Sequence, residues 1–461
     1  MNRADVQKLM ADLPTRLLDE PAEASGTAEL TNAMLITWLS RLDLQRVFNL
    51  GSPEGRAQLR RWCIQEREGR TLRQRIVRKA AGAARSATDR SRDALHPGVN
   101  LIGYLRGVLG MGEHVRMSAQ AMAAAQVPSG IVDYTLGLGP RRQPIEAGAA
   151  RLTWPKFQCN LFHINADQMM RTYWHLGEKY FAGRYNIGFW AWELARWPEH
   201  WIALLGAVDE VWAPSRFIRD ALAPVTAKPV LWMPLCVELP PVPKVSRSEF
   251  GASSDEFVFV FTFDGHSYFE RKNPAAAVRA FRSAFPESEK VRLVIKAMNA
   301  EACKHRWTEL LSEAGADQRI VLIDATWPRH RVLSLVQSSD AYVSLHRSEG
   351  FGRSPAEAML LGKPVIVTDY SGTVDFCRTD NALLVDYSLV AVATGSYVDA
   401  AGQVWAEPSI ECAARHMRVL YENRAMGPKI GANGRRTIAQ EFDAQTVGER
   451  YRARLNELDI I

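Results

Sequence analysis

The chain has 461 residues, of which 47% are hydrophobic and 23% are charged, and its formal net charge is +6. This length predicts two or three domains and excludes a small disulfide-stapled scaffold. No apolar stretch reaches the roughly eighteen residues of a membrane-spanning helix. The early residues are charged throughout and the six cysteines form no C-x-x-C pair, so we expect no secretory signal and no zinc site, and we expect a reducing cytoplasm.

Residues 1–96 are predicted to form a helical N-terminal extension, because apolar residues such as Met34, Trp38 and Leu42 recur at helical spacing. The excess positive charge lies in its basic segment, residues 60–92, with eleven Lys or Arg and three acidic residues. Two interpretations stay open for this segment: a surface for anionic lipid headgroups, or the solvated face of a helix. Nucleic-acid binding is disfavoured, since aromatic stacking platforms do not alternate with these charges.

After a breaker cluster at His96-Pro97-Gly98, short apolar runs alternate with amphipathic stretches, which is typical of βα units. They predict a first Rossmann-like domain over residues 97–240. The proline-rich segment Val237–Arg247 is predicted to be a linker. The strands expected before it are Val99–Ile102, Gln158–Ile164, Tyr185–Ala191, Glu210–Ala213 and Val230–Met233.

A second α/β series predicts a further Rossmann-like domain over residues 241–430. Its expected strands are Phe257–Phe263, Val291–Lys296, Ile320–Leu322, Ala341–Leu345 and Pro364–Thr368. Residues 431–461 are expected to be C-terminal helices, with the option of crossing back to the first domain. The predicted fold class is thus α/β: two facing Rossmann-like domains with a cleft between them, where ligands bind at the carboxyl ends of the strands.

The most informative motif runs from Tyr342 to Thr368, YVSLHRSEGFGRSPAEAMLLGKPVIVT. A strand leads into a glycine loop, and Ser354 is predicted to be the N-cap of a helix whose free N–H groups favour an anion such as a diphosphate. Glu349 and Glu357 flank this pocket, and carboxylates accept hydrogen bonds from sugar or ribose hydroxyls. Taken singly, Glu357 fits a capping-box glutamate and Glu349 a solvated loop charge. The glycines and the flanking strands favour the ligand interpretation.

Two further motifs lie at the carboxyl ends of strands. In FVFVFTFDGHSYFERKNPAAAVRAF, Arg271 and Lys272 can neutralise charge on a departing diphosphate, and the alternative is a solvated basic helix start. In GYLRGVLGMGEHVRMSAQAM, Gly107, Gly110 and Gly112 are predicted to form a turn ahead of a helix. Their order is not that of a dinucleotide-binding fingerprint.

Together these motifs resemble the retaining glycosyltransferases of family 4, which have the GT-B fold of two facing Rossmann-like domains. The hallmark of that family is Glu, seven residues, Glu, here Glu349-GFGRSPA-Glu357. The resemblance implies that Glu349 lies by the donor sugar, that Glu357 contacts the ribose, and that Lys272 binds phosphate. Arg271 is inferred to replace an arginine that family members carry earlier in this loop.

Where many family members have a histidine beside the donor sugar, this chain has Asn165, with His163 two residues earlier, and either can take that position. Under this fold Glu193 also points toward the cleft. The predicted catalytic residues are Lys272, Arg271, Glu349, Asn165 and Glu193. The predicted donor-binding residues are Gly110, Gly112, Arg271, Lys272, Glu349, Gly350, Phe351, Gly352, Ser354 and Glu357.

The resemblance implies a metal-independent hexosyltransferase, which fits the absence of an Asp-x-Asp motif from the sequence. It would move a hexosyl unit from a UDP- or GDP-sugar to a hydroxyl of a growing glycan, of the lipopolysaccharide O-antigen or exopolysaccharide type, with retention. No cofactor is expected besides this donor substrate, no metal site, and no nucleic-acid partner. The expected acceptor is a glycan or a lipid-linked saccharide, and the expected location is the cytoplasm, peripheral to the inner face of the plasma membrane through residues 60–92.

Two other functions stay open. A nucleotide-sugar 2-epimerase of the same architecture would need an acid/base pair and no acceptor. A non-catalytic polyanion-binding protein would use the basic segment, and its binding would fall steeply with salt.

Overall fold

The computed structural model describes residues 95–136, 150–287 and 289–461, together with 30, 34, 38, 44, 47–50 and 52–65 of the N-terminal part. In the latter part, helix α4 spans Pro53–Gln65, and Leu59 is buried against Leu44 and Phe48 in a small apolar cluster. Most of the basic segment lies outside the described residues, so its predicted membrane surface stays a prediction. None of the helices described is long and apolar enough to cross a membrane.

The first domain is built on a seven-stranded sheet in the order β3-β2-β1-β4-β5-β6-β7, and all neighbouring strands are parallel. The strands are β1 (His96–Gly103), β2 (Ser129–Asp133), β3 (Arg151–Leu152), β4 (Phe157–His163), β5 (Tyr185–Phe189), β6 (Glu210–Ala213) and β7 (Val230–Trp232). The helices are α6 (Gly110–Ala124), α7 (Ala166–Leu176) and α8 (Arg216–Leu222), with 3₁₀ segments at Glu178–Tyr180, Glu199–Ala207 and Ala223–Val225. The sequence analysis missed β2 and β3. The breaker cluster predicted at His96-Pro97-Gly98 forms the start of β1. The pairing of β1 with β4 shifts register between His96 and Val99, where Gly98 has φ of 128°, which a glycine tolerates.

The second domain contains a six-stranded parallel sheet in the order β10-β9-β8-β11-β12-β13. Its strands are β8 (Phe257–Asp264), β9 (Val291–Met298), β10 (Ile320–Asp324), β11 (Ala341–Ser344), β12 (Val365–Thr368) and β13 (Leu383–Val385). Its helices are α9 (Phe269–Lys272), α10 (Pro274–Ala284), α11 (Lys304–Ala314), α12 (Arg329–Ser338) and α13 (Arg353–Leu360), with 3₁₀ segments at Arg247–Phe250, Gly265–Ser267, Ala300–Cys303 and Ser371–Asp375. This strand order is that of a Rossmann sheet.

A hairpin that the sequence analysis did not predict follows β13. Strands β14 (Tyr387–Ala391) and β15 (Val404–Pro408) pair antiparallel and form a separate two-stranded sheet. The tip of this hairpin, residues 392–403, reaches the first domain: Gln403 Nε2 donates a hydrogen bond to Arg196 O at 2.7 Å. The hairpin therefore links the two domains on the side of the molecule that faces away from the C-terminal helices.

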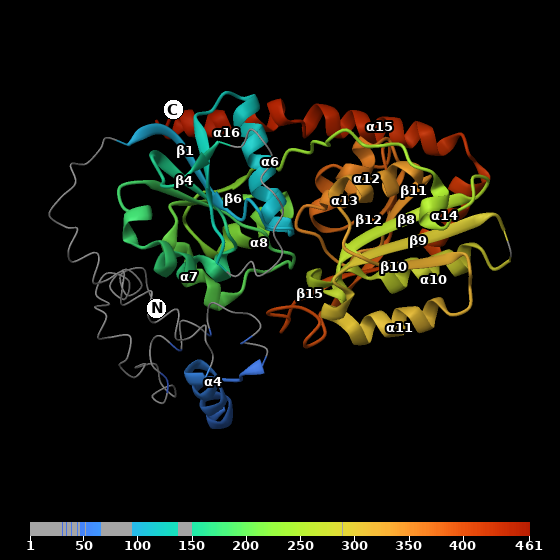
Figure 1. Cartoon of the computed structure of the whole chain (residues 1–461), viewed down its shortest axis with the longest axis horizontal. Coiled ribbons are helices and arrows are strands. Elements are labelled where there is room, and N and C mark those ends of the chain that lie inside the picture. The colour runs from blue at the N-terminus through green and yellow to red at the C-terminus, as the bar shows by residue number, and fades with distance from the viewer. Residues whose placement is uncertain are drawn as a thin grey trace.

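Three C-terminal helices follow: α14 (Ile410–Glu422), α15 (Met426–Glu441) and α16 (Ala444–Glu457). Figure 1 shows α15 and α16, in red, running from the second domain back across the first. Helix α16 packs on α6 so closely that a Cβ on Gly448 would lie 2.0 Å from Ala121 O. The Tyr451 hydroxyl donates a hydrogen bond to Pro234 O at 2.5 Å. The chain thus returns to its first domain.

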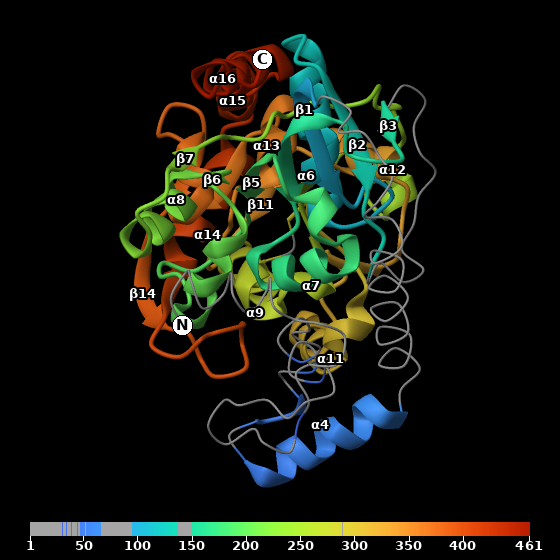
Figure 2. The ribbon, with the colours of Figure 1, turned by 90° about the vertical axis from the view of Figure 1, so that its left-hand side faces the viewer.

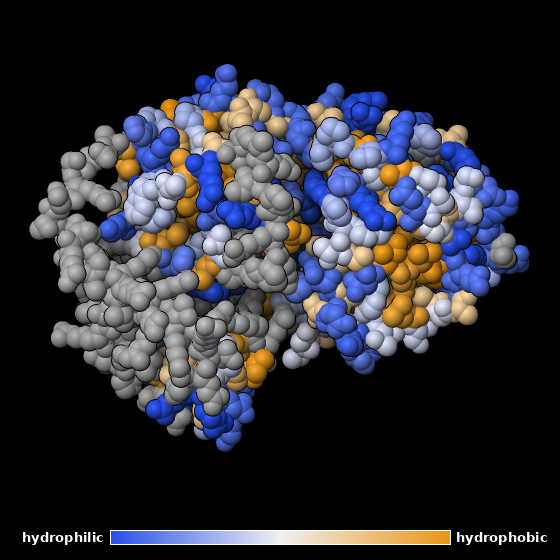
Figure 3. Space-filling model, in the orientation of Figure 1, coloured by the Kyte–Doolittle hydropathy of each residue, from blue (hydrophilic) through white to orange (hydrophobic). Residues whose placement is uncertain are grey.

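The predicted fold class is confirmed: two parallel sheets of Rossmann type face each other, as the two perpendicular views show (Figures 1 and 2). In each sheet the strand order reverses direction at one point, between β1 and β4 and between β8 and β11. Loops that leave a sheet at such a point diverge and leave a crevice. In Figure 3, mainly hydrophilic side chains lie at the visible boundary between the domains.

Candidate functional site

The loop after β11 holds Glu349 beside two cations from the loop after β8. Lys272 Nζ donates a hydrogen bond to Glu349 Oε1, and Arg271 Nη1 lies 3.2 Å from Oε2. Burial by itself raises the pKa of Glu349, but the two cations outweigh it and lower this pKa to about 2. The two cations therefore hold this carboxylate in its ionised form.

Arg271 is only 4% exposed, and its guanidinium is held on all sides. Its Nη1 donates to Ser348 O at 2.9 Å, its Nε donates to Ser267 O at 3.2 Å, and its Nη2 lies 3.8 Å from Glu193 Oε1 in the first domain. These partners make Arg271 a positioning residue that orients Glu349 and connects it to the other domain. Its predicted contact with phosphate stays a prediction.

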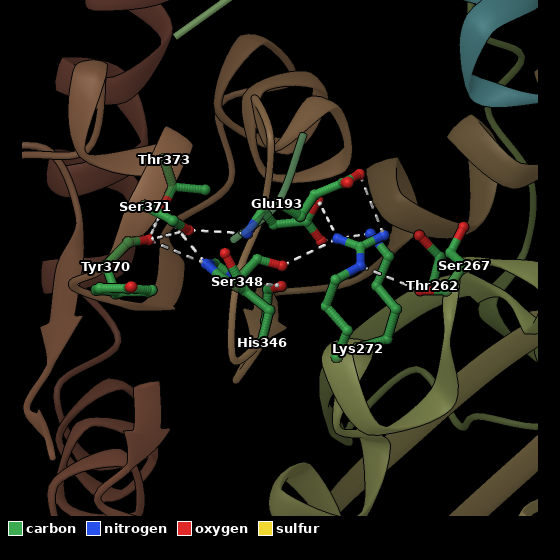
Figure 4. A network of polar contacts seen from close by, with 12 residues as sticks. Glu193, Thr262, Ser267, Lys272, His346, Ser348, Tyr370, Ser371 and Thr373 are labelled. Carbon is green, nitrogen blue, oxygen red and sulfur yellow. Dashed lines mark hydrogen bonds and ion pairs between the residues drawn. The ribbon is translucent and has the colours of Figure 1, made fainter. Parts of the chain in front are cut away.

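Residues after β12 fix the backbone of the glutamate loop (Figure 4). The Glu349 N–H donates to Ser371 Oγ at 2.7 Å, and the Gly372 N–H donates to Glu349 O at 2.9 Å. A Cβ on Gly372 would lie 2.3 Å from Gly350 O, so these loops approach each other too closely for a side chain. Two hydrogen bonds therefore fix the backbone of Glu349, whose side chain carries the carboxylate.

His346 lies in the same network (Figure 4). Its Nδ1 is 3.0 Å from Ser344 Oγ and its Nε2 is 3.4 Å from Thr373 Oγ1. Burial lowers the pKa of His346 to about 4. At neutral pH it is uncharged and braces the loop rather than adding a charge.

The predicted capping box of α13 is wrong. The helix begins at Arg353, and its N-cap is Gly352 with φ of 91°, without a side-chain cap. A Cβ on Gly352 would lie 2.3 Å from Thr373 Cγ2, so the loop packing requires glycine and moves the helix start ahead of Ser354. The Ser354 side chain instead hydrogen-bonds Tyr342.

Glu357 is consequently not a capping-box residue. It is 9% exposed, and its Oε1 lies 3.0 Å from Arg329 Nη2 and 3.6 Å from Arg353 Nη1. The same arginines approach Glu113 of α6 in the first domain, at 3.7 Å and 3.5 Å. Burial opposes ionisation of Glu113, but Arg353, Arg329 and Arg116 lower its pKa to about 2. Two ionic clusters thus cross from one domain to the other.

In the first domain, the glycine motif differs from its predicted geometry. Helix α6 begins at Gly110, so Gly110 and Gly112 lie in the first helical turn and not in a turn ahead of it. A Cβ on Gly112 would lie 2.1 Å from Gly107 O, so Gly112 serves the packing of this turn. Gly110 has open space beside it and lines the cavity between the domains.

The structure separates the two candidates after β4. His163 is fully buried, with its Nδ1 3.2 Å from His114 Nδ1, and burial holds its pKa well below the usual range. Asn165 lines the cavity, and its Oδ1 accepts a hydrogen bond from the Ala191 N–H at 3.1 Å. Of the two candidates, Asn165 is therefore the one that faces the cavity, and its place beside a donor sugar stays a prediction.

A single cavity of about 1150 Å³ collects nearly all the predicted residues. Gly112 is the exception. The predicted residues that line it are Gly110, Asn165, Glu193, Arg271, Lys272, Glu349, Gly350, Phe351, Gly352, Ser354 and Glu357. In the part of the chain that the structure describes, no group of three or more His, Cys, Asp or Glu side chains is placed to hold a metal ion.

The sequence analysis missed three cavity residues. Lys296 is 3% exposed, burial lowers its pKa to about 8, and a lysine closing a buried strand is a signal that could have found it. Glu113 follows the glycine motif directly, and its charge there is a weaker signal. Tyr397, whose hydroxyl donates to Glu193, lies on the unpredicted hairpin, where no motif marks it.

Two facing Rossmann-like domains with a charged cavity at their switch points define the GT-B class of fold. Residues 247–437, which span most of the second domain, match the family model for Glycosyl transferases group 1.

The chain is also 24% identical over 204 residues to "Putative glycosyltransferase EpsD" of Bacillus subtilis (strain 168), covering 44% of this chain and 46% of EpsD. It therefore spans about half the length of the curated relative that it matches.

Solved structures resemble the whole two-domain body. Sucrose-phosphate synthase from Thermosynechococcus elongatus has a TM-score of 0.58 at 16% identity, covering 78% of this chain and 98% of that one. Anabaena HepE in complex with UDP and glucose has a TM-score of 0.57 at 14% identity, covering 78% and 100%. Similarity at this level of identity establishes the shared GT-B fold.

Proposed function

We propose that this chain is a retaining, metal-independent glycosyltransferase of the family 4 type, which transfers a hexosyl unit from a nucleotide-diphospho-sugar to a hydroxyl of a growing glycan. The observation that carries the proposal is the triad of Lys272, Arg271 and Glu349 at the switch point between β8 and β11, beside the start of α13. Anabaena HepE, which shares the fold, was solved with UDP-glucose. A UDP- or GDP-sugar is the donor class we propose here.

The reaction breaks the bond between the anomeric carbon and a diphosphate oxygen and forms a bond to the acceptor oxygen. Charge then grows on the leaving diphosphate, where Lys272 and the free N–H groups at the start of α13 stabilise it. The acceptor proton leaves on the departing phosphate oxygen. Both oxygens of Glu349 are held by cations, and both of Glu193 by Tyr397 and Arg271, which supports retention without attack by either carboxylate.

The acceptor class rests on the family resemblance: a glycan of the cell-surface polysaccharide type or its lipid-linked precursor. Because a lipid-linked acceptor lies at a membrane, we also propose that residues 60–92 bind anionic headgroups at the inner face of the plasma membrane. Salt-sensitive co-sedimentation of the full chain with vesicles containing anionic lipid tests this second proposal. Equal binding to neutral vesicles would contradict it.

The test of the catalytic proposal uses nucleotide sugars and a matched pair of lysine variants. We expect a UDP- or GDP-sugar to protect the protein against thermal unfolding and to be turned over. Lys272→Met should lower turnover at least a hundredfold, whereas Lys290→Met, which changes an exposed lysine of the same domain, should not. Normal turnover by folded Lys272→Met would overturn the role of Lys272. Formation of an epimerised sugar from donor alone would identify an epimerase instead.

A further inference from the structure

The cavity between the domains has two ends of different chemistry. The basic end is defined by Lys272, which pairs with Glu349, and by Lys296 of the second domain; the acidic end is defined by Asp167 and Glu193 of the first domain. The ends meet where the Arg271 guanidinium approaches Glu193. An anion is attracted to the first end and repelled from the second. A nucleoside diphosphate and a second ligand are thereby directed to different ends.

Aromatic side chains surround the acidic end. The ring centroids of Trp192 and Trp201 lie 5.0 Å apart, those of Trp192 and Tyr397 5.8 Å, and those of Tyr268 and Tyr397 4.4 Å. All four residues border the cavity, where Tyr268 is half-buried and Trp192, Trp201 and Tyr397, at most 7% exposed, pack behind it. A sugar has an apolar ring face and a rim of hydroxyl donors, so aromatic walls with carboxylate acceptors suit it.

Tyr268 carries a second sign of a ligand site. Its backbone has φ of 62° and ψ of 107°, a conformation that bulky residues rarely adopt. Such strained residues cluster where a side chain must be held against a ligand. Here the strain places a half-buried tyrosine ring in the cavity wall, against Tyr397.

The hairpin tip, residues 392–403, closes this end from the second domain. The Arg196 N–H donates to Gln403 Oε1 at 3.2 Å, and His200 Nε2 lies 3.6 Å from Asp399 Oδ1. These contacts seat Tyr397 and Val398 over the first domain, where both line the cavity. The acidic end is therefore complete only when both domains contribute to it.

We propose that the aromatic and acidic end is the acceptor subsite, that it binds an uncharged sugar residue, and that the hairpin tip is a specificity element of it. This inference rests on the proposed glycosyltransferase function. Asp167, which is 6% exposed, is the carboxyl that accepts from a sugar hydroxyl. Burial, together with the neighbouring Asp399 and Glu193 carboxyls, raises its pKa to about 7, so the site disfavours another negative charge.

The test measures binding of methyl glycosides of neutral sugars and of the matching uronic acids, by calorimetry with UDP or GDP present. We expect a neutral glycoside to bind at least tenfold more tightly than its uronate. Asp167→Asn should reduce the ratio between the affinities for the neutral glycoside and for its uronate. Tyr268→Ala should weaken neutral-sugar binding about tenfold, Tyr268→Phe should retain it, and Tyr387→Ala, on the exposed face of the same hairpin, is the control.

Equal or tighter binding of uronates, no binding of either class, or unchanged binding by Tyr268→Ala would overturn the acceptor inference. Protection against thermal unfolding by nucleotide sugars is measured in parallel. Protection by none of them would contradict the proposed function, whereas normal protection combined with any of the binding failures contradicts the acceptor inference alone.

Discussion

Tyr397 and Glu193 lie 204 positions apart in the chain, yet the Tyr397 hydroxyl donates a hydrogen bond to the Glu193 carboxylate across the two domains. Glu193 in turn faces Arg271, which holds Glu349. The hairpin of the second domain thus reaches the triad of Lys272, Arg271 and Glu349 through a residue of the first domain. One chain of polar contacts, from Tyr397 through Glu193 and Arg271 to Glu349, therefore connects the hairpin that borders the cavity with the triad.

Tyr397→Phe removes one hydroxyl from this chain. We expect a loss of about 1–3 kcal/mol in the free energy of unfolding, because a buried carboxylate oxygen loses its donor. Urea unfolding measures this loss, and transfer assays should show a lower rate. Tyr387→Phe, on the exposed strand of the same hairpin, is the matched control and should change neither. If the two variants have equal unfolding free energies and equal transfer rates, the hydrogen bond from Tyr397 to Glu193 contributes to neither.

The pair of Lys272 and Glu349 should be strongly coupled. Glu349→Gln leaves Lys272 without its carboxylate, which costs roughly 3–5 kcal/mol, whereas Lys272→Met leaves Glu349 paired with Arg271 and should cost less. The double variant removes both charges, so its cost should be clearly less than the sum of the single costs. A double-mutant cycle from urea unfolding checks this. Additive costs would mean that the ion pair contributes little to folding.

Asp167 predicts a pH-dependent change in stability. Its folded-state pKa of about 7 exceeds the reference value of 3.8, so the folded state holds a proton that the unfolded state releases between these pH values. Ionising Asp167 in the folded state therefore lowers the free energy of unfolding. This loss is absent below about pH 4, grows as the pH rises, and is complete above about pH 7.

Asp167→Asn removes this titration. The variant should become more stable relative to wild type as the pH rises from 4 to 7, by up to about 4 kcal/mol, and the difference should then level off. Unfolding midpoints measured across this range test the expectation. A stability difference that does not vary with pH would show that Asp167 titrates normally.

Two glycines with positive φ allow the cost of an unfavourable backbone conformation to be measured apart from the cost of a steric clash. Gly362 has φ of 74° and open space around an added Cβ, whereas Gly352 has φ of 91° and faces Thr373. Gly362→Ala should cost about 1–2 kcal/mol for the conformation alone. Gly352→Ala should cost more and also weaken donor binding, since it displaces the start of α13. Calorimetric titration with UDP and GDP distinguishes the two variants, and equal affinities would contradict this reading.

Much of the site followed from local patterns. Buried apolar runs predicted every strand of the two sheets except β2, β3 and β13, and residues at the carboxyl ends of parallel strands necessarily gather at one edge. That is why Lys272, Glu349 and Asn165 were predicted from the sequence and line one cavity. The start of α13 was not predictable in this way, because Gly352 is the N-cap only through its close contact with Thr373.

The sequence by itself determined two α/β units, the spacing of Glu349 and Glu357, and the glycines between them, since these depend on residues close together in the chain. Only the tertiary structure decided that Asn165 and not His163 faces the cavity, and that Tyr397 joins Glu193. Such contacts depend on the relative placement of two domains and of a hairpin between them. No local periodicity records that placement, because it is fixed by packing between residues hundreds of positions apart.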